Sequence, residues 1–298
     1  MKPVVIESEA MRVGVLPAYG ARVVTLLDKR TGREWLQQGG QSANTDEGAD
    51  YLADEAVGWD ECFPTVSPWD ATNTPWQRPL RNHGDLWGRP WTIDSQTASA
   101  LTTSYVAPAF RFSRMIGVEG AQLTATYTVV NRSQAPLPYL WALHGLLIVT
   151  PEDRIVLPDV ATVTATYLTL DGRTGRTPSF AWPDTDGVLP FALDEVQPAS
   201  RNFAGKLYAS NIAGHRAVIG HGEQYLVIGW DEAIDHLGIW LNYGAWPSAG
   251  GGHHIALEPT TAAADHLGEA LATGNAVTLA PGASTSWTIS MTLSKDAR

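Results

Sequence analysis

The sequence predicts an all-β fold, built as one large antiparallel sandwich. Apolar and polar residues alternate with a period of two in several segments, which is typical of strands that bury one face. Helical periodicity is short and rare, and no repeated strand–helix alternation indicates a parallel sheet. The 298 residues contain no internal repeat and no low-complexity linker, so we expect a single domain over residues 1–298.

The expected strands are rich in Val, Ile, Thr and aromatic residues, and Gly, Pro or Asp separates them. In chain order they cover residues 11–16, 21–27, 110–118, 123–129, 139–149, 224–230, 237–243, 254–258 and 287–293. Two short helices are expected at 50–57 and 264–272. The segment 150–199 is rich in Pro, Gly and Asp, and we expect it to be mostly loop.

Composition excludes several classes of protein. Hydrophobic residues make up 44% of the chain, which is too apolar for a disordered protein. The 20 basic and 31 acidic side chains give a net charge of −11, which argues against a nucleic-acid-binding face. A single cysteine, Cys62, rules out a disulfide scaffold, and no apolar run approaches the ~18 residues of a membrane span.

The first ten residues, MKPVVIESEA, lack the basic and apolar segments of a secretory signal. We therefore expect a soluble, cytoplasmic protein that binds neither nucleic acid nor membrane, as a monomer or homodimer. An acidic stretch between Asp46 and Glu61 contains no Lys or Arg. It lacks the ligand spacing of a calcium loop, so we expect a solvated loop and helix face.

Two histidines stand in segments that suit acid–base chemistry, because the pKa of imidazole lies near 6.5. His83 lies between Asn82 and Gly84 in an expected loop, where the alternative is a solvated side chain. His144 lies inside an apolar run, where the alternative is a buried structural histidine.

Glu258 closes an apolar segment that starts at His254. Alternation places His254 and Glu258 on one face of the strand, and Pro259 is expected to end the strand and leave Glu258 at its rim. Burying a carboxylate without a partner is costly, so Glu258 is expected to be paired or functional, with its pKa raised by desolvation.

Indole rings are frequent around these segments, and Trp87, Trp141 and Trp240 are among them. They either fill the core or offer apolar platforms to the C–H faces of a sugar. A cupin-like metal site of His253, His254 and Glu258 is the metalloprotein alternative. Adjacent residues of a strand point to opposite faces, so this metal site is disfavoured and we expect no metal.

Five segments resemble, in the right order, the galactose mutarotase-like superfamily, which includes aldose 1-epimerases and hexose-6-phosphate epimerase-like proteins. They are LPAYGA at 16–21 followed by DKRTGREWL at 28–36, GWDECFP at 58–64, Asn82-His83-Gly84, the strand of His144, and Glu258-Pro259. The resemblance implies a β-supersandwich with a few short helices and an open sugar cleft. It implies an aldose 1-epimerase-type isomerase that interconverts sugar anomers without a metal or an organic cofactor.

Carried over to this sequence, the resemblance makes Glu258 the catalytic base and His144 the general acid, which acts as a protonated imidazole. It makes His83 the residue that binds and polarises the sugar. Arg78 or Arg81 matches an arginine that contacts sugar hydroxyls. The remaining expected substrate contacts are Asn82, Asp85, Trp87, Trp141 and Trp240.

Two departures from the family pattern leave the substrate open. Gly145-Leu146-Leu147 follows His144 where the family usually has an aromatic residue, and His83-Gly84-Asp85-Leu86-Trp87 differs from the sugar-phosphate branch. The alternatives to a free-sugar epimerase are therefore a non-catalytic carbohydrate-binding protein and a sugar-phosphate epimerase. The last would use Arg78, Arg81 or Arg89 on the phosphate.

Overall fold

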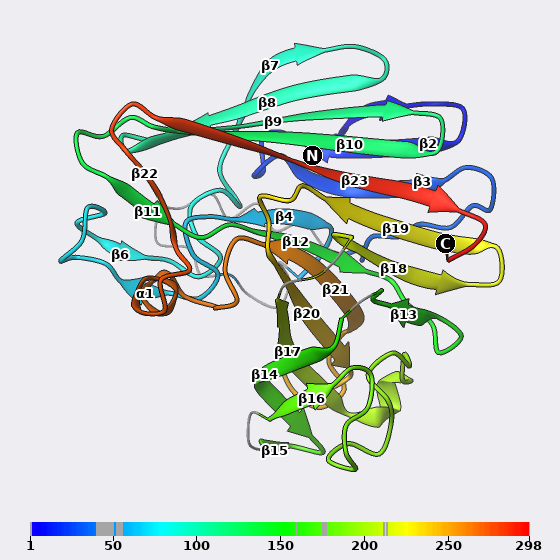
Figure 1. Cartoon of the computed structure of the whole chain (residues 1–298). Helices are drawn as coiled ribbons and strands as arrows, with labels where there is room; N and C mark the ends of the chain where they lie inside the picture. Colours follow the sequence, from blue (N-terminus) through cyan, green and yellow to red (C-terminus); the bar gives the residue numbers. More distant parts are fainter. Residues whose placement is uncertain are drawn as a thin grey trace.

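The computed structural model describes residues 2–39, 51, 56–158, 160–174, 178–210, 212 and 214–297. This part of the chain folds almost entirely into antiparallel strands, which form two large sheets that face each other (Figure 1). The all-β prediction is thus confirmed. Within the same residues, no helix is long and apolar enough to cross a membrane.

Within the described residues, the larger sheet contains 11 strands, and both His144 and Glu258 lie on it. Its neighbours in space are, in order, β1 (Val4–Glu7), β2 (Met11–Leu16), β3 (Arg22–Asp28), β4 (Trp59–Cys62), β12 (Ala142–Leu147), β21 (His253–Thr260), β20 (His236–Tyr243), β17 (Phe203–Ser210), β14 (Thr162–Leu170) and β15 (Arg173–Thr174), with β16 (Ser179–Ala181) also paired to β14.

The second sheet packs on the first and contains eight strands in the described residues. Their order is β13 (Arg154–Val156), β18 (Arg216–His221), β19 (Gln224–Trp230), β23 (Ser284–Ser294), β10 (Gln122–Asn131), β9 (Phe110–Glu119), β8 (Ala100–Val106) and β7 (Thr92–Gln96). Smaller elements complete the described chain: the ladders β11 (Leu137–Tyr139) with β22 (Val277–Leu279) and β5 (Trp69–Asp70) with β6 (Pro79–Leu80), the helix α1 (Leu267–Ala272) and the 3-10 turn η2 (Ala199–Arg201).

The core lies between the two sheets. In β9, β10 and β23 every second residue is buried, as the sequence alternation predicts. Tyr127 of β10 stacks on Trp287 of β23 with ring centroids 5.4 Å apart, and Trp141 packs against Trp287 at 4.9 Å. Burying each such large apolar side chain contributes roughly 1.5–3 kcal/mol.

The central strands of the larger sheet differ, because β12 and β21 are buried on both faces. One face of each strand, with Leu143 and Leu257, joins the core between the sheets. The opposite face, with His144 and Glu258, borders a cavity. Because both faces of these strands are covered, the polar side chains of His144 and Glu258 lie inside the protein.

Three sequence expectations differ from the structure. The segment 150–199, expected to be mostly loop from its Pro, Gly and Asp content, contains a nine-residue strand, β14. Pro259 does not end its strand, since it pairs with Leu237 inside β21 and Thr260 pairs beyond it, so Glu258 is buried and not at a rim. The predicted helix at 264–272 is confirmed in part by α1.

The acidic stretch is only partly described. Asp60 and Glu61 are buried in β4 and not solvated, because both take cationic partners there. Its other members (Asp46, Glu47, Asp50, Asp54 and Glu55) and most of the helix expected at 50–57 lie outside the described residues.

Candidate active site

The site is assembled by four neighbouring strands of the larger sheet: β12, β21, β20 and β17. The β12–β21 ladder pairs Ala142 with Thr260 and Leu146 with Ala256, so His144 and Glu258 face each other across it. The next ladders pair Gly238 of β20 with Glu258 on one side and with Tyr208 of β17 on the other. Polar residues on one face of these strands therefore meet at one place.

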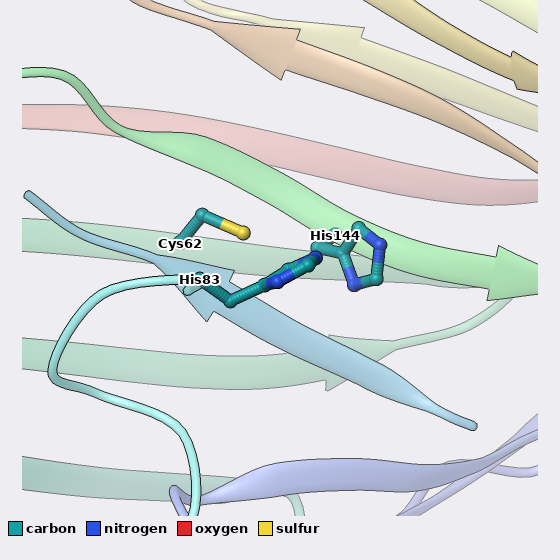
Figure 2. Close-up of side chains that lie close together, drawn as sticks. All are labelled: Cys62, His83 and His144. Carbon is teal, nitrogen blue, oxygen red and sulfur yellow. The ribbon is translucent and has the colours of Figure 1, made fainter. Parts of the chain in front are cut away.

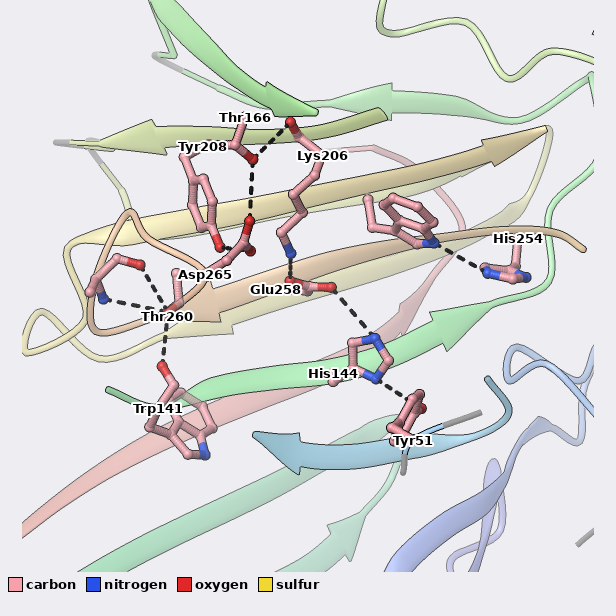
Figure 3. Close-up of polar contacts among 12 residues, drawn as sticks. Tyr51, Trp141, His144, Thr166, Lys206, Tyr208, His254, Glu258, Thr260 and Asp265 are labelled. Carbon is pink, nitrogen blue, oxygen red and sulfur yellow. Dashed lines mark hydrogen bonds and ion pairs between the residues drawn. The ribbon is translucent and has the colours of Figure 1, made fainter. Parts of the chain in front are cut away.

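Glu258 forms a buried ion pair with Lys206, whose ammonium group hydrogen-bonds its Oε2 atom (Figure 3). The two residues come from β21 and β17, and β20 runs between them. Gly238 on β20 makes this contact possible, because a Cβ atom at that position would lie 2.8 Å from Glu258 Oε2 and 3.1 Å from Lys206 Nζ. The other carboxylate oxygen, Oε1, is buried and accepts no hydrogen bond from the described residues.

His144 lies beside this vacant oxygen. Its Nε2 atom is 4.0 Å from Glu258 Oε1, and its Nδ1 atom is 3.4 Å from the hydroxyl of Tyr51. Lys206, Glu258, His144 and Tyr51 thus form a continuous series of polar contacts along the cavity (Figure 3).

His83 reaches the same place from the loop before β7, with ring centroids 4.7 Å from His144 and 3.8 Å from Tyr51, on which it stacks. The loop turns sharply there, with φ of 57° at His83 and 71° at Gly84. Only glycine fits the second position, because a Cβ atom on Gly84 would lie 2.0 Å from the carbonyl oxygen of Phe63. Asn82 Oδ1 lies 3.0 Å from His83 Nδ1 and orients the ring.

These groups line a cavity of about 370 Å³. Its wall also carries Tyr51, Asn82, Tyr167, Trp240, Trp246, His254 and Asp265. Tyr167 and Trp240 lie nearly parallel, 6.3 Å apart, and Trp246 packs edge-on against Trp240. One side of the cavity is therefore aromatic and the other is polar.

Asp265 supplies a second carboxylate to the cavity. It accepts hydrogen bonds from the Tyr208 hydroxyl at 2.7 Å and from the Thr166 hydroxyl at 3.4 Å (Figure 3). Both donors are neutral, so this carboxylate retains acceptor capacity toward a ligand.

Burial sets the protonation states of the site. Desolvation raises the pKa of Glu258, although Lys206 opposes the shift. Burial works against the charge on Lys206, but the neighbouring carboxylate outweighs it and the pKa of the ammonium is raised. The cavity therefore holds a stable lysine cation next to a carboxylate that is more basic than usual.

The pKa values of the site histidines are shifted downwards. Burial, followed by repulsion from His83 and Lys206, holds the pKa of His144 well below 6.5. Burial lowers the pKa of His83 to about 3 and that of His254 to about 4. All three are therefore neutral at pH 7 in the free site, whereas the resemblance implies a protonated His144.

The structure brings together His83, His144, Glu258, Asn82 and Trp240 from the predicted set. Trp141 is elsewhere: it is fully buried between the sheets, and its indole N–H donates to Glu61. The expectation that Trp141 contacts substrate is therefore wrong, because its ring faces the core.

The other predicted substrate contacts brace the His83 loop and do not line the cavity. Arg81 donates to the carbonyl oxygens of Gly84 at 2.7 Å and Trp87 at 2.6 Å, and its guanidinium stacks on the Trp87 ring. The Trp87 indole donates to the carbonyl oxygen of Asn82 at 2.8 Å. Arg78 forms an ion pair with Asp85.

The cupin-like alternative is not supported by the geometry. His254 lines the cavity and contacts Trp240, whereas His253 turns to the opposite side and its Nε2 atom bonds to the carbonyl oxygen of Gln197.

Sequence reasoning missed Tyr51, Tyr167, Lys206 and Asp265, and it counted Trp246 among the indoles near the site but not among the substrate contacts. One signal was present for Lys206, because it is a lone cation within the apolar run of β17 and a buried lysine needs a partner. The aromatic residues and Asp265 lie in segments whose pattern carries no such signal.

Comparisons with known proteins identify the fold. No family model and no curated protein matches the sequence. Solved structures do match: a candidate aldose 1-epimerase from Escherichia coli K12 has a TM-score of 0.71 at 17% identity, with 99% of each chain covered.

Two galactose mutarotase-like proteins are similar as well. The one from Clostridium acetobutylicum has a TM-score of 0.70 at 17% identity, covering 98% of this chain and 95% of its own. The one from Lactobacillus casei ATCC 334 has a TM-score of 0.69 at 17% identity, covering 98% and 99%. This chain has the fold of the galactose mutarotase-like proteins.

Proposed function

We propose that this protein is an aldose 1-epimerase-type isomerase that interconverts the anomers of a sugar by acid–base ring opening. The observation that carries the proposal is the buried Glu258 Oε1 atom, which accepts no hydrogen bond from the described residues and faces a cavity 4.0 Å from His144 Nε2. A base and a donor are thereby placed side by side where a sugar can enter. The structurally similar proteins, a candidate aldose 1-epimerase and two galactose mutarotase-like proteins, support the same reaction class.

Glu258 Oε1 removes the proton from the anomeric hydroxyl while His144 donates a hydrogen to the ring oxygen. The bond between the anomeric carbon and the ring oxygen breaks, and the anomeric C–O bond becomes the carbonyl of the open-chain aldehyde. Rotation about the adjacent C–C bond and reversal of both proton transfers close the ring as the other anomer. Each of these transfers contributes ~10²–10⁴-fold to the rate.

A neutral His144 is compatible with the donor role, because a neutral imidazole N–H can polarise an oxygen by a hydrogen bond. Transfer of that hydrogen to the ring oxygen leaves His144 as an imidazolate, whose negative charge the nearby Lys206 cation stabilises until the ring closes and the proton returns. The Tyr51 hydroxyl next to Nδ1 directs the hydrogen of the imidazole to Nε2, which faces Glu258. Lys206 holds Glu258 Oε2, so Oε1 is the oxygen that acts as base, and its charge stabilises the negative charge at the reacting groups.

The lining supports a neutral sugar as substrate. Tyr167, Trp240 and Trp246 offer an aromatic wall for the C–H face of a ring, and Asp265 is an acceptor for hydroxyl groups. A phosphate needs a cation that is not already paired. Among the described residues that line the cavity, Lys206 is the permanent cation, and it is already in an ion pair with Glu258.

We also propose that the whole chain forms one galactose mutarotase-like domain. A single hydrophobic cluster supports this, because it runs from Ile6 of β1 to Leu293 of β23 and includes residues of both large sheets.

The test is the rate of anomer interconversion, followed by polarimetry or NMR after dissolving one pure anomer of each of several aldoses. The wild type is expected to accelerate at least one of them above the buffer rate. Glu258→Gln is expected to lose ~10²–10⁴ of that acceleration, because the amide cannot take the proton.

Two results would contradict the proposal. Full activity in a folded Glu258→Gln variant would remove Glu258 as the base. Sugar binding by calorimetry without any acceleration would instead identify a carbohydrate-binding protein on the same fold.

A further inference from the structure

Cys62, the sole cysteine of the chain, lies next to the two site histidines. One ligand atom from each of Cys62, His83 and His144 lies within 4.8 Å of the others, and the thiol points toward the imidazoles (Figure 2). The reaction proposed above uses neither the thiol nor its strand. This juxtaposition therefore needs a separate explanation.

The topology fixes the three residues on separate segments. In the β4–β12 ladder, Cys62 pairs with Ala142 and Asp60 pairs with His144, so the thiol and the imidazole project from the same face of the sheet. The bridge between Phe63 and Gly84 brings the His83 loop against the end of β4.

The histidines present suitable nitrogen atoms. Asn82 Oδ1 accepts from His83 Nδ1, which leaves the lone pair on Nε2, and such an outer hydrogen bond is what orients metal-binding histidines in other proteins. Within the described part of the chain, the ring of His144 makes only long polar contacts, at 3.4 Å and 4.0 Å, so it can bind an ion without losing a strong hydrogen bond to those residues.

A thiolate with two imidazoles suits zinc and similar soft divalent ions, and it does not suit magnesium or calcium. Bond lengths of about 2.3 Å to sulfur and 2.0–2.1 Å to nitrogen put tetrahedral ligand atoms roughly 3.5 Å apart. The ligand atoms, which lie within 4.8 Å of one another, must therefore move closer together by about 1 Å when an ion binds. The fourth position would face the cavity and hold water.

We propose that Cys62, His83 and His144 form a binding site for a zinc ion, which inhibits the isomerase. Binding releases the thiol proton to solvent and forms one metal–sulfur and two metal–nitrogen bonds. An ion at this place occupies both imidazoles, so neither can contact a sugar. The inhibition rests on the proposed function, whereas the metal binding does not.

The binding is tested on the full chain with Co²⁺ as a spectroscopic probe and Zn²⁺ as its competitor. We expect one equivalent of Co²⁺ to give thiolate-to-metal charge-transfer absorption, which Zn²⁺ abolishes and excess Mg²⁺ does not. Cys62→Ser and Cys62→Ala are expected to remove this band and weaken zinc binding at least ~100-fold, beyond the ~10–100-fold typical of an outer hydrogen-bond partner. Two variants are used because either one alone could disturb the core, and circular dichroism verifies their fold.

His253→Gln is the matched control, because His253 lies on the other face of β21 and bonds to the carbonyl oxygen of Gln197. It is expected to keep both the band and the zinc affinity. A wild-type protein without the thiolate band, or zinc binding that survives in folded Cys62 variants, would overturn the site.

Inhibition is a second, independent readout. Zinc is expected to suppress anomer interconversion in the wild type and in His253→Gln, and to lose this effect in Cys62→Ser, which keeps its basal rate. If no sugar is isomerised, the proposed function fails while the spectroscopic result still decides the metal site. If the enzyme is active and zinc leaves it unaffected, the inhibitory role is wrong.

Discussion

Glu61 and Glu258 are two buried carboxylates on strands that flank β12, and they are held in opposite ways. Glu61 faces the core between the sheets, and both of its oxygens are occupied. Its donors are Trp59 at 3.0 Å, Arg114 at 2.7 Å, Tyr127 at 3.0 Å and Trp141 at 2.9 Å. Glu258 faces the cavity with one oxygen bonded to Lys206 and the other vacant.

Burial alone does not separate the two groups, because their exposed fractions are 1% and 2%. Desolvation raises the pKa of both, to about 7 for Glu61. The number of donors separates them. A carboxylate whose acceptors are all satisfied is a structural group, whereas one with a vacant oxygen at a cavity is available for proton transfer.

Glu61→Gln is expected to show the largest effect on the fold. Replacing the carboxylate leaves Arg114 buried without its charge partner, and the new amide N–H₂ must face another donor. Removing one partner of a buried pair costs about 3–5 kcal/mol in the free energy of unfolding, which chemical denaturation measures. Glu258→Gln also removes a charge partner, but one donor instead of four faces the new amide and the charge of Asp265 still acts on Lys206, so this variant is expected to lose less than half as much. Equal losses would break the distinction between the two carboxylates.

Lys206→Met tests what keeps Glu258 in its basic form. The proton binds Glu258 as the pH falls through its raised pKa, and loss of the adjacent cation raises this pKa further. The acid limb of kcat/KM is therefore expected to move to higher pH. On this limb the rate changes ~10-fold for each pH unit, so the loss is expected to be ~10-fold or more at the acid end of the profile and to shrink as the pH rises.

The shape of this pH profile discriminates between two roles for Lys206. If it acts on the charge of Glu258, the activity of Lys206→Met recovers as the pH rises. If it acts only through the local structure or on the charge of the reacting groups, the rate is reduced by the same factor at every pH, and the claim that Lys206 sets the pKa of Glu258 fails.

The sequence predicted correctly those strands that bury one face and expose the other to solvent. β9, β10 and β23 alternate strictly, and their predicted ranges agree with the structure within two or three residues. β14 alternates as β10 does over residues 162–166, and it was missed because the Pro, Gly and Asp content of the whole segment 150–199 was taken to indicate loop. The prediction that the strand ends at Pro259 was wrong, because the loss of one backbone N–H does not break a strand that is paired on both sides.

The site could be predicted only in part, for a related reason. His144 and Glu258 could be found because each is a polar residue in a mostly apolar segment, where a buried polar side chain needs a partner or a function. A strand that is buried on both faces gives no signal for which face is the cavity, so Trp141, which lies just before β12, was assigned to the wrong side. Lys206 contacts Glu258 across an intervening strand, and such a contact depends on sheet order, which alternation does not encode.

Gly238→Ala sharpens the comparison with the smallest change. The added methyl group would lie 2.8 Å from Glu258 Oε2 and 3.1 Å from Lys206 Nζ, which are the ends of flexible side chains. They can move aside, so the free energy of unfolding is expected to change by less than ~1 kcal/mol. The displaced carboxylate no longer meets the sugar correctly, and kcat/KM is expected to fall ~3–10-fold, within the range that small misplacements cause.

Gly117→Ala on β9 is the control, because its Cβ would meet nothing within 4 Å, and it should leave the rate unchanged. Unaltered activity in Gly238→Ala would mean that the geometry of the Lys206–Glu258 pair does not limit the reaction, and Glu258 would then resemble Glu61 more closely than its vacant oxygen indicates.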